Sequence, residues 1–186
     1  ERHDNWAKEC ADNGVTLVKD TQNLLPIVTK KHKRILLEVM GDFPSNERVI
    51  PYFKGKLERE GFEVTIYENE GFEVMGDTVE NFKSRYDLIL YLANIETASN
   101  KTVSRINWHT MFGLGNNMPW MVHELPVSFV SIGNPYHLMD APMVKTFING
   151  YCNSEYVMDA IIDKMLGKSE FKGTSPTDPF CGRMDL

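Results

Sequence analysis

Three side chains whose types suit a sugar ligand lie close together in the middle of the chain: Arg105, Asn107 and Trp108. An indole ring can stack on a sugar ring, while amide and guanidinium groups form hydrogen bonds with its hydroxyls. The surrounding segment, residues 94–118, shows little hydrophobic periodicity, and long irregular loops are often functional. The alternative is a packed loop in which the Trp108 indole belongs to the core.

A second group of polar side chains follows a short apolar segment. Val127–Ile132 is rich in β-branched and aromatic residues, which predicts a buried strand. Gly133 and Pro135 end this strand, and its carboxyl end then presents His137 and two further polar residues, Asn134 and Tyr136. Ligands of open α/β sheets bind at the carboxyl ends of the strands, so these two residues are candidate ligand contacts. The alternative is an ordinary turn between a strand and a loop.

Acidic residues gather after another predicted strand, at Glu68, Glu70, Glu73 and Asp77. A general acid would need one of them to be desolvated beside a second group, and a solvated acidic loop explains the same cluster. The histidines lack the spacing of metal ligands, and the chain has no P-loop, nucleophile elbow or dinucleotide fingerprint. The sequence therefore assigns no catalytic residue, no metal site and no cofactor.

Alternating strands and helices must position these residues. Strands are predicted at 34–40, 62–67, 87–93, 127–132 and 144–151, and helices at 4–19, 46–60, 78–85 and 155–166. This alternation implies a mostly parallel sheet that is covered on both faces. We expect an α/β three-layer sandwich of the flavodoxin-like or Rossmann-like type over residues 1–167, with residues 168–186 as a surface tail.

Composition excludes several classes of partner. The 186 residues fit one domain, and the net charge of −6 argues against a nucleic-acid surface. No apolar run approaches the roughly 18 residues that a membrane span needs. The three cysteines are widely spaced and odd in number, which indicates reduced thiols and favours the cytoplasm. A secreted or cell-surface location stays open, because a missing N-terminus could have carried a signal or a lipid anchor.

Several motifs resemble glycoside hydrolase family 3. Residues 11–20, Ala-Asp-Asn-Gly-Val-Thr-Leu-Val-Lys-Asp, followed by Leu24-Leu25-Pro26, resemble the opening of the second domain of that family. Asn134-Pro135-Tyr136, the segment 147–151, Leu166-Gly167, Phe171-Lys172-Gly173 and Ser175-Pro176 look like its later part and its ending. Residues 104–108, Ser-Arg-Ile-Asn-Trp, are similar to a segment of the bacterial β-N-acetylglucosaminidase branch.

The resemblance implies that this chain is a non-catalytic C-terminal domain. The family places its aspartate nucleophile in an N-terminal (β/α)8 barrel, which this chain lacks. In one branch the acid/base also belongs to the barrel; in the β-glucosidase branch it is a glutamate of the second domain, and Glu68, Glu70 and Glu96 are candidates that match no motif. The implied partners are that barrel and a glycan containing N-acetylglucosamine, such as a peptidoglycan fragment.

The expected role of this domain is to pack on the barrel and to contribute side chains to the substrate rim. The candidates for the rim are Arg105, Asn107, Trp108, Asn134 and Tyr136. One alternative is a freestanding flavodoxin-like module that binds a small polar ligand. Another is an independent enzyme, which would need two carboxyl groups about 5 to 9.5 Å apart in a cleft. An exposed apolar patch would favour the domain that docks on a barrel.

Overall fold

The computed structural model of the chain describes residues 2–41, 44–67, 78–95, 105–108, 110–111, 114–115, 118–119 and 121–183. A six-stranded sheet forms its centre, with the strand order β1-β8-β7-β4-β2-β3. The strands are β1 (Thr16–Asp20), β2 (Arg34–Met40), β3 (Glu63–Ile66), β4 (Leu88–Ala93), β7 (Val127–Ser131) and β8 (Thr146–Asn149). All neighbours pair in parallel except β1, which pairs antiparallel with β8 at one edge.

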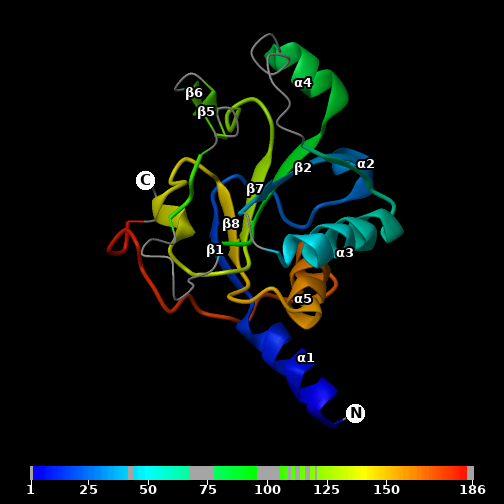
Figure 1. Cartoon of the computed structure of the whole chain (residues 1–186), viewed down its shortest axis with the longest axis vertical. Helices are drawn as coiled ribbons and strands as arrows, with labels where there is room; N and C mark the ends of the chain where they lie inside the picture. The colour runs from blue at the N-terminus through cyan, green and yellow to red at the C-terminus, as the bar shows by residue number, and fades with distance from the viewer. Residues whose placement is uncertain are drawn as a thin grey trace.

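Helices and loops cover both faces of this sheet (Figure 1). The helices are α1 (Arg2–Gly14), α2 (Thr29–His32), α3 (Asn46–Arg59), α4 (Val79–Arg85) and α5 (Glu155–Met165), with a 3₁₀ turn, η2 (His137–Met139). The short strands β5 (Thr110–Met111) and β6 (Leu114–Gly115) pair antiparallel in a separate sheet. The predicted three-layer α/β fold with a mostly parallel sheet is therefore confirmed.

The two faces of the sheet bury different side chains, because successive residues of a strand point to opposite sides. In β4 all six residues are buried, since this strand lies inside the sheet. Leu88, Leu90 and Leu92 join the first core cluster with side chains from α3 and α5. Ile89 and Tyr91 join the second cluster, which lies beneath α4 and the segments 121–125 and 138–144.

The predicted helix over 4–19 is wrong in its second half. The helix α1 ends at Gly14, and Thr16–Asp20 forms the edge strand β1 instead. Pairing with β8 joins Thr16 to Asn149 and Leu17 to Ile148, and the β-branched Thr16 and Val18 suit this extended backbone. The sequence pattern shows five strands, and the sixth exists because β8 offers it a hydrogen-bonding edge.

The other predicted strands and helices are present, with ends that differ by no more than two residues. Residues 168–183 contain no helix or strand and lie along the surface. Gly173 packs so closely that a Cβ there would lie 2.5 Å from Thr16 Oγ1 and 2.6 Å from the Gly14 carbonyl oxygen. This close contact ties the tail to the start of β1.

Candidate functional site

The carboxyl ends of β2 and β4 form the switch point of the sheet. β3 follows β2 on one side, while β4, β7 and β8 follow on the other, which is the strand order of flavodoxin-like folds. Ligands of such sheets bind in the crevice where the order reverses. Here that crevice lies between Gly41 after β2 and Asn94 after β4.

A network of side-chain amides occupies this crevice. Asn94 is fully buried; its amide donates to Ser45 Oγ at 2.9 Å and to Asn46 Oδ1 at 2.7 Å. Its Oδ1 accepts from Asn153 Nδ2 at 3.0 Å. Asn46 Nδ2 in turn donates to the Gly41 carbonyl oxygen at 2.7 Å. These amides form hydrogen bonds with one another and with the backbone. In the described part of the switch point they therefore stabilise the loops and are not available to bind a ligand.

Gly41 shows how tightly this crevice is closed. Its φ of +104° lies in the region that favours glycine, and a Cβ would lie 2.3 Å from the Asn94 carbonyl oxygen. Asn46 is the first residue of α3, and its side-chain amide is part of the network. These contacts weigh against the alternative of a flavodoxin-like module with a small ligand at this point.

A second network lies at the end of β7. Ser131 Oγ donates to the Asn134 carbonyl oxygen at 2.8 Å and lies 2.8 Å from His137 Nδ1. Because the Ser131 proton is used, His137 Nδ1–H must be the donor in that second contact. His137 Nε2 then accepts from Asn134 Nδ2 at 2.9 Å. The buried imidazole is therefore a structural group that fixes the loop.

Asn134 is buried, and its side chain is engaged inside the protein. Its amide donates to His137 and also to the Ile95 carbonyl oxygen at 3.2 Å, while its Oδ1 accepts from the Tyr136 backbone N–H at 3.0 Å. The side chain of Asn134 therefore positions the loop. Tyr136, the next rim candidate, is 53% exposed and directs the loop's aromatic surface outward.

The candidates from residues 105–108 lie beside this loop. Asp140, which follows η2, forms an ion pair with the Arg105 guanidinium and accepts from the Ile106 backbone N–H at 3.1 Å. This contact raises the pKa of Arg105, so the guanidinium stays charged. Asn107 is exposed, and the half-buried Trp108 packs against the second core cluster. The structure therefore brings Arg105 next to the loop of Tyr136, and gives Trp108 part of a core role.

Three described carboxylates have pKa shifts opposite to the shift that acid catalysis needs. Hydrogen bonds to Tyr156, Lys164 and Arg34 lower the pKa values of Asp4, Asp12 and Asp87, respectively. A general acid requires the opposite shift. Glu68, Glu70, Glu73, Asp77 and Glu96 lie outside the described residues.

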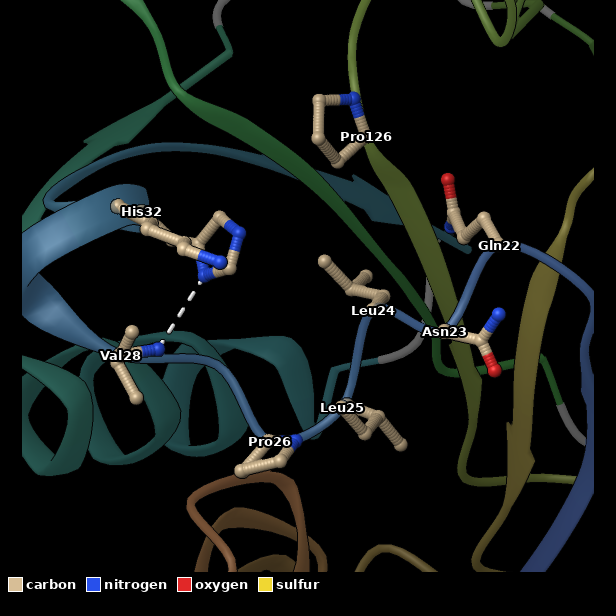
Figure 2. A pocket seen from close by; sticks show the side chains of 9 residues that line it. Gln22, Asn23, Leu24, Leu25, Pro26, Val28, His32 and Pro126 are labelled. Carbon is tan, nitrogen blue, oxygen red and sulfur yellow. Dashed lines mark hydrogen bonds between the residues drawn. The ribbon is translucent and has the colours of Figure 1, made fainter.

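A pocket of about 380 Å³ lies at the opposite, amino edge of the sheet (Figure 2). Its lining residues are Gln22, Asn23, Leu24, Leu25, Pro26, Val28, Lys31, His32 and Pro126. His32 Nδ1 accepts from the Val28 N–H at 3.2 Å, and desolvation is the main cause of its lowered pKa. Gln22 donates to Val127 and Thr146, so it is structural. Sequence reasoning missed this pocket, because its walls come from two parts of the chain that are distant in sequence, residues 22–32 and Pro126.

Metal ligands and membrane spans are both absent from the part of the chain that the structure describes. No cluster of three or more His, Cys, Asp or Glu side chains there could hold a metal ion. Among the described helices, none combines the length and the apolar character that crossing a membrane requires.

Comparisons with known proteins place the chain in a family, although no family model matches it. A β-N-acetylglucosaminidase/β-glucosidase of Cellulomonas fimi is 39% identical over 190 residues, which cover 98% of this chain and 33% of the relative. A solved β-glucoside phosphorylase, BglX, is 41% identical with a TM-score of 0.88 and covers 98% of this chain and 32% of its own. A family 3 β-N-acetylglucosaminidase from Paenibacillus has a TM-score of 0.60 at 15% identity over 92% of this chain and 32% of its own, and shares the fold.

The fold and its carboxyl-edge loops define a flavodoxin-like α/β domain. The chain belongs to glycoside hydrolase family 3, as its opening and closing motifs predicted. It spans about a third of the length of the relatives that it matches, which is consistent with a C-terminal domain.

Proposed function

We propose that this chain is the non-catalytic C-terminal domain of a bacterial enzyme that cleaves β-linked N-acetylglucosamine from glycans such as peptidoglycan fragments. Its role is to pack on an N-terminal (β/α)8 barrel and to lend side chains to the substrate rim. The observation that carries this proposal is the 39% identity to a β-N-acetylglucosaminidase/β-glucosidase along 98% of the chain, which is only a third of that protein.

The exposed part of the rim consists of Arg105, Asn107 and Tyr136. A charged guanidinium, an amide and a phenol ring offer one cation, several hydrogen-bond donors and one stacking surface, which together suit a sugar with an acetamido group. Trp108 contributes the part of its ring that is not packed against the second core cluster. Asn134 holds the loop in place, because its Oδ1 accepts from the Tyr136 backbone N–H.

The test is hydrolysis of an aryl N-acetyl-β-glucosaminide by this chain alone and by a polypeptide that also carries the upstream residues. We expect turnover only from the longer polypeptide. Turnover by the chain alone, abolished by Glu68→Gln, Glu70→Gln or Glu96→Gln, would place the acid chemistry in this domain and refute the non-catalytic role.

A second candidate reaction is phosphorolysis of a β-glucoside, because a β-glucoside phosphorylase is 41% identical with a TM-score of 0.88. In that reaction inorganic phosphate replaces water as the acceptor, and the product is a sugar phosphate. An aryl N-acetyl-β-glucosaminide and an aryl β-glucoside should therefore each be assayed with and without inorganic phosphate. Phosphate-dependent release of a sugar phosphate would favour the second candidate, and phosphate-independent release of free N-acetylglucosamine would favour the first.

A further inference from the structure

The segment after β7 has an apolar outer face in addition to its apolar inner face. The inner side chains of Leu138, Ala141 and Val144 are buried in the second core cluster. The outer side chains, which we call the Tyr136 surface, are those of Tyr136, Met139 and Met143, and they are 53%, 49% and 36% exposed. A segment that faces water on its outer side is expected to be polar there.

The backbone beneath the Tyr136 surface is held in place. Ser131, Asn134 and His137 form a closed set of buried hydrogen bonds at its start. Asp140 accepts from the Ile106 backbone N–H in the middle of the segment. The exposure of the three apolar side chains is therefore a fixed feature of the fold, and it does not depend on a loose loop.

Other exposed apolar residues in the described ranges stand apart from one another. Trp6 lies on α1 with the Arg2 guanidinium 4.6 Å from its ring and His3 at its edge. Val28 lines the pocket at the amino edge. Scattered apolar residues are normal on a surface, whereas three within eight residues form a candidate interface, in which Tyr and Met are enriched.

We propose that the Tyr136 surface is the site where the preceding domain of the same polypeptide docks. This inference rests on the proposed function, and it names the contact residues that the proposed function leaves open. The relatives carry most of their length outside the part that matches this chain, so a large domain is available to cover the surface. Docking there would also place Arg105 at the junction of the two domains, since Asp140 holds it beside this segment.

The chemistry of the Tyr136 surface indicates which kind of surface on the preceding domain would match it. The Arg105–Asp140 ion pair lies beside the Tyr136 surface, and Lys19 Nζ donates to the Pro142 carbonyl oxygen at 3.0 Å, so an aromatic ring and two thioethers are exposed next to charged groups that are engaged within the domain. Thioether side chains adapt to irregular apolar partners. The matching face on the preceding domain should therefore be apolar and uncharged.

Methionine oxidation tests this contact directly. The 186-residue chain and the polypeptide with its upstream residues are treated with hydrogen peroxide, and peptides are quantified by mass spectrometry. Since oxidation follows exposure, we expect Met139 and Met143 to react about tenfold more slowly in the longer polypeptide. Equal rates in the two forms would overturn the proposal.

A pair of charge substitutions provides the matched control. Met139→Glu should lower the unfolding temperature of this domain more in the longer polypeptide than in the chain alone, because only the former loses the contact. Val28→Glu adds the same charge to a similarly exposed apolar residue at the other edge, and it should shift both forms equally. If Met139→Glu, like Val28→Glu, lowers the unfolding temperature equally in the longer polypeptide and in the chain alone, the proposed docking surface is overturned.

The same preparations separate this inference from the proposed function. Slow oxidation of Met139 and Met143 in a polypeptide without glycosidase or phosphorylase activity would support the docking surface and refute the proposed activity. Active polypeptide with unprotected methionines would refute the docking surface alone.

Discussion

The buried side chain of Asn94 links two loops at the carboxyl edge of the sheet. Its side chain joins the turn before α3 to the loop before α5 through Ser45, Asn46 and Asn153. Each amide proton and the carbonyl oxygen of Asn94 has a partner, which is the condition for burying such a group at low cost. The residue therefore belongs to the architecture, although its position after a parallel strand is that of a ligand contact.

Replacing this amide should destabilise the domain. Asn94→Ala removes the hydrogen bonds that the buried amide forms with Ser45, Asn46 and Asn153, so we expect a loss on the order of 2 kcal/mol in the free energy of unfolding. Urea titration followed by circular dichroism measures this loss. Asn107→Ala, at an exposed asparagine, serves as the control and should leave the midpoint unchanged. An unchanged midpoint for Asn94→Ala would mean that the network contributes nothing to stability.

Tyr136 is the rim candidate whose exposure suits a functional test. Since 53% of it is exposed, Tyr136→Ala should leave the stability of the chain within about 0.5 kcal/mol. In the polypeptide with its upstream residues we expect KM to rise several-fold, because the ring lies at the proposed junction of the two domains, where the substrate rim forms. Steady-state kinetics measure this change, with Tyr136→Phe as the control that keeps the ring. A normal KM for Tyr136→Ala would remove this residue from the rim.

At the scale of elements, three charged residues, Asp12, Lys164 and Lys172, form a clamp that connects α1 with α5 and the tail. Lys164 of α5 is fully buried, and its Nζ donates to Asp12 Oδ1 of α1 at 2.8 Å and to the Glu170 carbonyl oxygen at 2.5 Å. Lys172 of the tail binds the other oxygen of Asp12 at 2.6 Å. α1 projects beyond the sheet in Figure 1, and this clamp, with the buried Ala11, secures its base. The hydrogen bond from Lys164 is the main cause that lowers the pKa of Asp12 to about 2.

The clamp makes stability depend on pH in a defined window. Because the pKa of Asp12 falls from 3.8 in the unfolded chain to about 2 in the folded chain, its stabilisation is complete above about pH 4 and disappears as the pH falls toward 2. Asp12→Asn leaves Lys164 buried without its counter-charge and should cost about 3 kcal/mol at pH 7. Urea titrations at several pH values should show the difference between the two proteins shrinking below pH 4. A difference that stays constant down to pH 2 would contradict this role.

At the scale of the whole molecule, the tail completes the domain. Phe171 packs against the first core cluster and Phe180 against the second, and Thr177 Oγ1 lies 3.4 Å from the Pro135 carbonyl oxygen. The tail therefore runs from the base of α1 to the loop of Tyr136. Its contacts connect the clamp to the carboxyl edge of the sheet.

Two truncations separate the parts of the tail. A chain that ends after Gly167 loses the contacts of Lys164 with Ser169 and Glu170 and the packing of Phe171, so we expect its unfolding temperature to fall by several degrees. A chain that ends after Gly173 keeps these contacts and should fall less. Thermal unfolding of both proteins measures the difference. Equal falls for the two truncated chains would show that Thr177 and Phe180 carry the stability of the tail.

The sequence by itself determined the parts of this protein that depend on local pattern. Apolar strands such as 87–93, the helix that Gly167 ends, and the opening and closing motifs all identify a flavodoxin-like domain of family 3. Neighbouring residues carry that information, so it can be read without coordinates. For the candidate rim, the sequence predicted which residue types could contact a sugar, but not which of them are exposed.

Only the tertiary structure decided the rest. β1 is a strand because β8 lies beside it; the β-branched Thr16 and Val18 suit a strand, but they did not by themselves distinguish it from a continuation of the helix before. Asn134 and Tyr136 are two residues apart, yet one is buried in hydrogen bonds to Ile95 and His137 while the other faces water. Both distinctions depend on groups distant in sequence that meet after folding, because burial and hydrogen bonding are properties of the packed chain.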